Sequence, residues 1–211
     1  MPEKDVSPDP DVSATTAARK KRAVVERDRA RSQILDAARD IIRDNGVFSL
    51  SVVAVAEATG LTRTSVYRYF DGPPAMVEAL AEETVGRIYA RIADLDVAGS
   101  RSLDGYGRAT VEEYCNDSEV NRQTVLLAGA QRFSDELVDP EVIVLENLRA
   151  RQAQGLVEFD DVELAARVIV TYFRGALYGW ASGLYTDEEF AVEVARSTDV
   201  GFALCGGKET L

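Results

Sequence analysis

The residues with the clearest capacity for chemistry lie within positions 51–70, SVVAVAEATGLTRTSVYRYF. Arg63 and Tyr67 stand four residues apart, and so do Thr64 and Arg68, which places each pair one helical turn apart on the same side. Arginine can form two hydrogen bonds with guanine, threonine can contact a base edge or methyl group, and a tyrosine hydroxyl can bind phosphate. These side chains favour a helix that lies in the major groove of DNA.

Two short helices joined by a tight turn are needed to position these side chains. Apolar residues recur at three- and four-residue spacing after Ser51, whose hydroxyl can cap the first helix. Gly60 can end this helix in the left-handed conformation. Thr62 can cap a second helix, which has Val66 and Phe70 on its apolar side. The spacing predicts a DNA-binding helix-turn-helix; the alternative is an ordinary corner between two helices with a solvated polar face.

The segment 31–80 resembles the DNA-binding domain of the TetR (tetracycline-repressor) family of bacterial regulators. ILDAARDIIRDNGVFSLS, at 34–51, is similar to the first helix of that domain, and TRTSVYRYF, at 62–70, matches the family's most recognisable signature. The resemblance implies an all-α fold. In that fold an N-terminal three-helix helix-turn-helix DNA-binding domain precedes a C-terminal helical domain for ligand binding and dimerisation.

The resemblance also assigns contacts with DNA. Ser51 would contact a phosphate, Arg63 and Thr64 would face bases, and two tyrosines would touch backbone phosphates. The full set of expected DNA-binding residues is Ser51, Thr62, Arg63, Thr64, Ser65, Tyr67, Arg68 and Tyr69. Family members usually carry a phosphate-binding lysine at the start of the next helix. This chain has Pro73 near that point, so one expected contact has no lysine to make it, although proline suits the first turn of a helix.

The composition argues against most enzyme classes. The 211 residues include no histidine, which excludes a Ser-His-Asp triad, a Cys-His pair and the histidine-containing zinc and iron sites. There is no P-loop and no dinucleotide-binding glycine motif, so we expect no enzymatic activity, no cofactor and no metal. Chemistry by carboxylates or lysine stays open as an alternative. Cys115 and Cys205 are isolated, which is typical of reduced, packed thiols.

The distribution of charge agrees with a DNA-binding N-terminal part. The chain carries a formal net charge of -12, but residues 19–70 alone sum to +5 and residues 71–211 sum to -14. A basic region attached to an acidic one orients the molecule towards a polyanion. Neither a signal peptide nor an apolar run of membrane-spanning length is visible, so we expect a cytoplasmic protein with no membrane partner.

We expect three regions along the chain. Residues 1–23 should be a disordered extension with a basic end, residues 24–72 the DNA-binding domain, and residues 73–211 the helical regulatory and dimerisation domain. The basic run at 18–22 is either an arm that contacts DNA or a solvated linker.

Apolar periodicity predicts the helices. The first helix should run from Val24 or Arg29 to Asp44, and Phe48 and Leu50 should fill the small core beside it. Further helices are predicted at 73–95, 103–116, 118–131, 140–154, 161–183 and 186–204.

The resemblance implies a homodimer joined through the last two helices and therefore a palindromic operator. Glycines repeat every four residues in the helix at 161–183, which favours close approach of another helix from the same chain or a second subunit. The expected interface residues are Val168, Gly175, Gly179, Gly183, Val194 and Phe202. Aromatic residues and one arginine suggest a pocket for a largely apolar small molecule. We expect it between the helix at 73–95, which by the resemblance connects the head to the body, and the other helices of the body. Its expected lining residues are Tyr106, Tyr114, Phe133, Tyr172, Arg174 and Trp180.

The sequence thus predicts a sequence-specific, DNA-binding transcriptional regulator, most often a repressor in the TetR family, that a small-molecule ligand releases from its operator. The alternative is a helical protein that binds a ligand or partner and whose DNA-binding head no longer binds operator DNA.

Overall fold

The computed structural model describes residues 10–97, 102–128 and 139–209, and these ranges are almost entirely helical. The head consists of α1 (Pro10–Asn45), the short 3-10 helix η1 (Val47–Ser49), α2 (Val52–Thr59) and α3 (Arg63–Tyr67). The body consists of α4 (Pro73–Val97), α5 (Leu103–Cys115), α6 (Ser118–Ala128), α7 (Pro140–Ala153), α8 (Val162–Ala181) and α9 (Asp187–Leu204). The two-residue strands β1 (Val157–Glu158) and β2 (Lys208–Glu209) pair antiparallel, a small ladder that the sequence did not predict.

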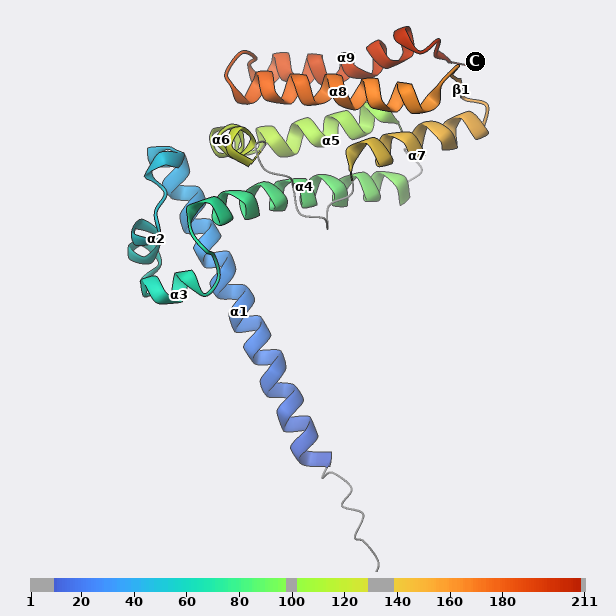
Figure 1. Cartoon of the computed structure of the whole chain (residues 1–211). Helices are drawn as coiled ribbons and strands as arrows, with labels where there is room; N and C mark the ends of the chain where they lie inside the picture. The colour runs from blue at the N-terminus through green and yellow to red at the C-terminus, as the bar shows by residue number, and fades with distance from the viewer. Residues whose placement is uncertain (1–9, 98–101, 129–138, 210–211) are drawn as a thin grey trace, which may run out of the picture.

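The helices of the body lie in layers, and the head is attached at one end of these layers (Figure 1). α8 and α9 run antiparallel and form the outermost layer, α5, α6 and α7 lie beneath them, and α4 lies below and leads to the head. α1 packs against α2 and α4 near its C-terminal end, and its N-terminal part projects past α3, away from the body.

The head has its own apolar core, which also receives one residue from the body. Ile34 and Ile42 of α1, Val55 of α2 and Val66 of α3 are fully buried together. Val120 of α6 belongs to the same cluster. Because burial of such a side chain stabilises the folded chain by about 1.5–3 kcal/mol, this cluster fixes the angle of the two short helices. It also attaches the head to α6.

Local hydrogen bonds set the ends of α2 and α3 as the sequence predicts. Ser51 Oγ accepts a hydrogen bond from the backbone amide of Ala54 at 3.1 Å, and Thr62 Oγ1 accepts one from the amide of Ser65 at 3.1 Å. Gly60 ends α2 with φ 70°. A Cβ on Gly60 would meet no atom within 4 Å, so the left-handed backbone, rather than close packing, requires a glycine there.

Two sequence predictions about the head are wrong. The extension was expected to be disordered to residue 23, but α1 is continuous from Pro10, because alanine, arginine, lysine and glutamate favour helix throughout residues 17–31. Phe48 was expected in the core but is 96% exposed. In a 3-10 turn, residues three apart share a face, so Val47 packs inward with Leu50 and Phe48 points outward.

Candidate nucleic-acid interface and ligand cavity

α3 presents its inner side to the head core and its outer side to solvent. Val66 is completely buried, whereas Arg63 and Thr64 are exposed and Tyr67 is 56% exposed. The outer side therefore consists of a guanidinium, a hydroxyl and a phenol on a rod whose orientation the core fixes. These side chains are free to contact a groove and its phosphates without any rearrangement of the fold.

The other residues expected at DNA divide into two kinds. Ser51 and Thr62 already use their hydroxyls as helix caps, and Thr62 Oγ1 lies 2.9 Å from Ser65 Oγ. Arg68 is exposed at the C-terminal end of α3, while Tyr69 is half-buried against the head core. The structure thus brings four of the eight expected residues onto one exposed side, and the other four support or border it.

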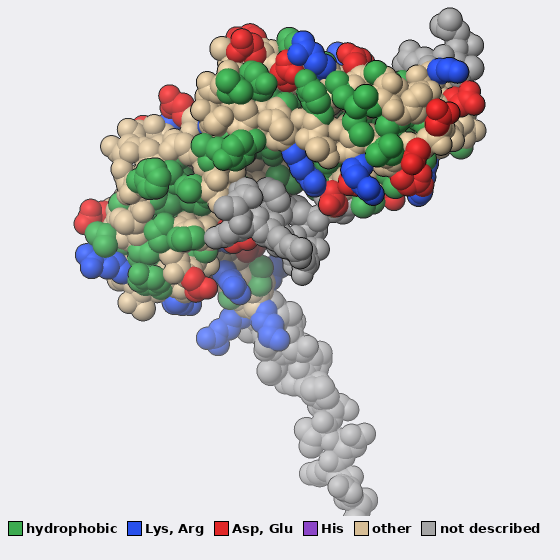
Figure 2. Space-filling view, turned by 45° about the horizontal axis from the view of Figure 1, so that its top comes forward, with side chains coloured by type: hydrophobic (Ala, Val, Ile, Leu, Met, Phe, Trp, Pro, Cys, Tyr) green, Lys and Arg blue, Asp and Glu red, His purple; other side chains and the backbone are tan. Residues whose placement is uncertain are grey.

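The arginines on this surface are available to pair with an outside partner. Within the described part of the chain, neither Arg63 nor Arg68 forms an ion pair, in contrast to the arginines of α1 that face the body. Figure 2 shows further Lys and Arg side chains along the edge of the head where α1 begins to project. Pro73 begins α4, as the sequence predicts for a proline in a first turn.

Comparison with protein families decides the identity of the head. The model of the bacterial regulatory proteins of the tetR family matches residues 34–80, which contain α2, α3 and the core-forming part of α1. The head is a DNA-binding domain of the TetR family. The protein is therefore a DNA-binding transcriptional regulator rather than an enzyme, as the helix-turn-helix predicts.

Solved structures of bacterial regulators share the fold of about four fifths of this chain at low sequence identity. A TetR-family regulator from Syntrophomonas wolfei is 16% identical, with a TM-score of 0.64 over 83% of this chain and 96% of that one. SmeT, the repressor of a Stenotrophomonas maltophilia multidrug efflux pump, is 18% identical, with a TM-score of 0.65 over 83% and 89%. Thermus thermophilus FadR, solved with lauroyl-CoA, is 17% identical, with a TM-score of 0.61 over 82% and 93%. No curated protein matches the chain.

The body contains a cavity of about 760 Å³. Its described walls come from all six helices of the body. Isoleucine, valine, leucine and aromatic side chains make most of the lining, with a few hydroxyls and one Arg–Asp pair. This volume and mostly apolar lining are typical of small-molecule sites.

Three of the six expected ligand residues line the cavity. These are Tyr106, Tyr114 and Arg174. Trp180 is fully buried behind the wall, where it stacks on Phe190 with 5.0 Å between ring centroids. Tyr172 lies elsewhere, and its hydroxyl donates to Glu193 of α9 at 2.5 Å. The prediction that Trp180 and Tyr172 line the cavity is therefore wrong, and Phe133 lies outside the described residues.

The sequence placed the expected pocket beside α4, but the expected lining residues included none from that helix. The side chains of Thr84, Val85, Ile88, Tyr89 and Ile92 line it from one side of that helix. Their spacing of three and four residues was visible, but an apolar track of this kind is equally typical of a helix that packs on a filled core.

A polar cluster behind the cavity ties α6, α8 and α9 together. Asp187 accepts hydrogen bonds from Ser118 Oγ at 2.6 Å, Trp180 Nε1 at 2.7 Å and Arg122 Nη2 at 2.9 Å. The Arg122 guanidinium also lies over the Trp180 ring, 4.6 Å from its centroid. Burial by itself raises the pKa of Asp187, but the three hydrogen bonds together outweigh burial, and the net pKa is lowered.

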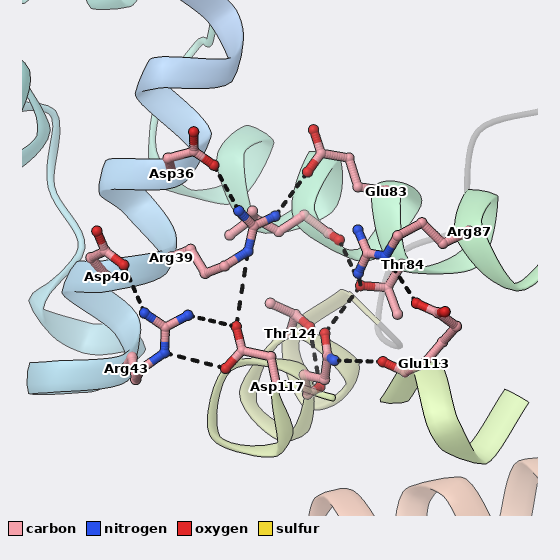
Figure 3. A network of polar contacts seen from close by, with 12 residues as sticks. Asp36, Arg39, Asp40, Arg43, Glu83, Thr84, Arg87, Glu113, Asp117 and Thr124 are labelled. Carbon is pink, nitrogen blue, oxygen red and sulfur yellow. Dashed lines mark hydrogen bonds and ion pairs between the residues drawn. The ribbon is translucent and has the colours of Figure 1, made fainter. Parts of the chain in front are cut away.

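A second polar network joins the head to the body (Figure 3). Arg43 of α1 donates to Asp117, the residue just before α6, at 2.8 Å, and Arg39 donates to Glu83 of α4 at 2.9 Å. The Val47 amide donates to Gln123 Oε1 of α6 at 2.7 Å. The head therefore contacts two different helices of the body through directional bonds, in addition to the shared core.

The exposed side of α8 and α9 carries apolar and small side chains. We name this surface the α8–α9 face; its members are Leu164, Thr171, Gly175, Val192 and Ala195. Of the expected interface residues, Gly175 lies on it with open space around its Cα. Gly183 also has open space, with φ 81° just beyond the end of α8. Val168 and Phe202 are half-buried against the body core.

Two expected interface residues are turned inward, which corrects that prediction. Val194 is only 5% exposed, inside the body core. A Cβ on Gly179 would lie 2.6 Å from the Tyr185 ring, so close approach of a side chain from the same chain accounts for this glycine. A pattern of glycines shows that something approaches a helix closely, but it does not say which chain supplies the neighbour.

The cysteines are suited to packing rather than reactivity. Burial raises the pKa of Cys115 to about 11, and burial also raises the pKa of Cys205, so both thiols are protonated at neutral pH. Within the described ranges, no cluster of three or more potential metal ligands occurs. In the same ranges, no helix combines the length and hydropathy needed to cross a membrane.

Proposed function

We propose that the protein is a homodimeric repressor that binds a palindromic operator through α3 and leaves it when a small molecule occupies the body cavity. The observation that carries this proposal is the outer side of α3, where Arg63, Thr64 and Tyr67 are exposed on a helix held from behind by Val66. Arg63 and Thr64 would contact base edges, and Tyr67 would contact phosphate.

Dimerisation through the α8–α9 face supports binding to two half-sites. An exposed surface of apolar and small residues, on two antiparallel helices, suits a four-helix contact with a second copy. Exposed Leu164 and Val192 would be buried, and Gly175 would allow the paired helices to approach closely. A two-fold axis at this face would place the two α3 helices in successive major grooves, roughly 34–36 Å apart.

The contacts between head and body supply a physical route for release. α4 both lines the cavity and leads directly to the head, and α6 both lines the cavity and holds Arg43 through Asp117. A ligand that shifts either helix would move the heads relative to each other. The loss of DNA affinity cannot exceed the ligand's preference for the DNA-incompetent arrangement over the DNA-competent one.

The projecting part of α1 would add contacts outside the helix-turn-helix. Arg19, Lys20, Lys21 and Arg22 are exposed and form no ion pair in the described part of the chain. Such a basic helix would lie along phosphates that flank each half-site. These contacts would add affinity for DNA of any sequence and make binding more sensitive to salt.

Selection from a random pool of duplex DNA tests the proposal. Full-length protein would be incubated with the pool, bound fragments would be amplified over several rounds, and the enriched sequences would be aligned. We expect an inverted repeat whose half-sites lie about one helical turn, or a multiple of it, apart. Enrichment of no motif would refute operator binding and leave the ligand-binding alternative. A motif without symmetry would refute the dimer.

A further inference from the structure

The cavity carries no net charge among its described lining residues. Arg174 and Asp139 are the charged residues of that lining, and Arg174 Nη2 lies 3.1 Å from Asp139 Oδ1. The two charges neutralise each other at a partly exposed position, since each side chain is about half exposed. The remainder of the described lining is apolar or bears neutral hydroxyls.

Most of the buried hydroxyls in the cavity are already committed to the protein. Thr124 donates to the carbonyl of Asn121 at 3.1 Å, Ser197 to the carbonyl of Val194 at 2.6 Å, and Thr110 to the carbonyl of Tyr106 at 2.8 Å. These back-bonds to their own helices leave them poor donors for a ligand.

Tyr114 is different. Its side chain is only 6% exposed, and its ring packs against Trp180 and Phe190. Its hydroxyl forms no hydrogen bond with any group in the described part of the chain, although the residue lines the cavity. Burial raises the pKa of Tyr114, so the phenol keeps its proton and is a donor. Because the residue lines the cavity, this hydroxyl is available to an acceptor that enters there.

We propose that the effector is an uncharged, largely apolar molecule with a hydrogen-bond acceptor that the Tyr114 hydroxyl binds. An ionic ligand would lose its hydration in this cavity and find no unpaired counter-charge among the described lining residues. A hydrocarbon would gain from burial but would leave the Tyr114 hydroxyl without a partner. This inference rests on the proposed role of the cavity as the effector site, but it concerns the chemistry of the ligand.

Three probes with similar ten-carbon chains separate the possibilities: 2-decanone, which is neutral and has an acceptor, decanoate, and decylammonium. Each would be titrated into the DNA-free protein at pH 7 by isothermal titration calorimetry. Trp180 is the single tryptophan of the chain and its ring centroid lies 5.9 Å from that of Tyr114, so its fluorescence reports where the probe binds. We expect 2-decanone to bind at least about tenfold more tightly than either ion and to change the emission of Trp180.

The Tyr114→Phe variant tests the hydrogen bond. It keeps the ring packing and removes a hydroxyl that has no partner, so thermal stability should not fall, while the affinity for 2-decanone should fall about five- to tenfold. Tyr172→Phe is the matched control, because Tyr172 lies outside the cavity with its hydroxyl on Glu193, and the affinity of this variant for 2-decanone should stay within about twofold of the wild type.

The Asp139→Asn variant tests the neutrality of the cavity. Asn can replace Asp139 as the N-cap of α7, so the helix should stay intact, but Arg174 loses its counter-charge. Decanoate should then bind about three- to tenfold more tightly than to the wild type, with little change for 2-decanone.

The proposal is overturned if decanoate or decylammonium binds the wild type as tightly as 2-decanone does. Unchanged binding of 2-decanone to Tyr114→Phe overturns it too, and so does failure of all three probes at concentrations up to about 1 mM. Because no DNA is present, each of these results would refute the ligand class and leave the operator proposal standing.

Discussion

Asp117, the residue that precedes α6, lies 2.8 Å through its Oδ2 from Nη2 of Arg43 near the end of α1. This pair joins the DNA-binding head to a helix that lines the cavity, and Arg43 is held on its other side by Asp40 at 2.7 Å. With Val120 in the head core, the contact makes α6 part of both halves of the molecule. A change in the cavity can therefore reach the head through α6 as well as through α4.

Asp117→Asn should destabilise the protein by about 1 kcal/mol, because the partly buried carboxylate that accepts from Arg43 is removed. Urea unfolding followed by Trp180 fluorescence measures the change. Glu163→Gln is the matched control: it removes an ion pair with Arg149 that is more than half exposed, and it should leave the free energy of unfolding close to the wild-type value. Equal effects of the two variants would contradict a specific link between head and body.

Gly175→Arg should separate the proposed dimer into folded monomers. A Cβ at Gly175 would meet no atom of the described chain within 4 Å, so the fold should tolerate arginine, but a second copy on the α8–α9 face would not. Gly86→Arg is the control, because Gly86 is an exposed helical glycine with equally open surroundings on α4. Sedimentation should give monomer for the first variant and dimer for the second. A Gly175→Arg protein that still dimerises places the interface elsewhere.

Neutralising the projecting part of α1 should weaken DNA binding at low salt and lower its dependence on salt. In a variant with Arg19, Lys20, Lys21 and Arg22 all changed to Gln, the slope of log affinity against log salt should fall by roughly 0.9 for each phosphate that the helix no longer neutralises. Anisotropy titrations on one labelled duplex at several salt concentrations give this slope. An unchanged slope would mean that the basic run is solvated when the head is on DNA.

The Asp187 cluster predicts a loss of stability in acid. The pKa of Asp187 is lowered in the folded protein. Its carboxylate therefore stabilises the fold at pH values above the ordinary aspartate pKa of about 3.9. This stabilisation is lost as the pH falls through the lowered pKa. Asp187→Asn should therefore lower the free energy of unfolding by about 1 kcal/mol at pH 7, a value that allows for the partial exposure of the side chain. Near pH 3 the difference between the two proteins should be much smaller. Unfolding curves of both proteins at several pH values test this, and a difference that does not depend on pH would refute it.

Much of the fold could be predicted because local signals agree with tertiary packing. Ser51, Gly60 and Thr62 mark helix ends by their own hydrogen-bonding and backbone preferences, and the structure uses them in that way. The exposed side of α3 followed from helical spacing alone. Phe48 could not be placed, because nothing in the sequence shows that residues 47–49 form a 3-10 turn, which sends Val47 rather than Phe48 into the core.

The cavity and the body surfaces were harder to predict because they depend on which helices become neighbours. Trp180 and Tyr114 are both aromatic residues of the body, yet one packs behind the wall and the other lines it. Gly175 and Gly179 belong to one repeat, yet one faces solvent and the other faces Tyr185. Sequence periodicity gives the side of a helix, but only the assembled helices decide what that side meets.

DNA binding depends most on the outer side of α3. Fluorescence anisotropy with the duplex recovered by selection, and with a scrambled duplex, measures the contribution of this side to DNA affinity directly. We predict that Arg63→Ala loses about 1–3 kcal/mol on the selected duplex and discriminates less between the two, and that Tyr67→Phe weakens binding to both. Arg108→Ala and Tyr178→Phe, which remove exposed groups of the same kinds from the body, should bind like the wild type. Wild-type affinity in both α3 variants would contradict the central claim that this helix contacts DNA.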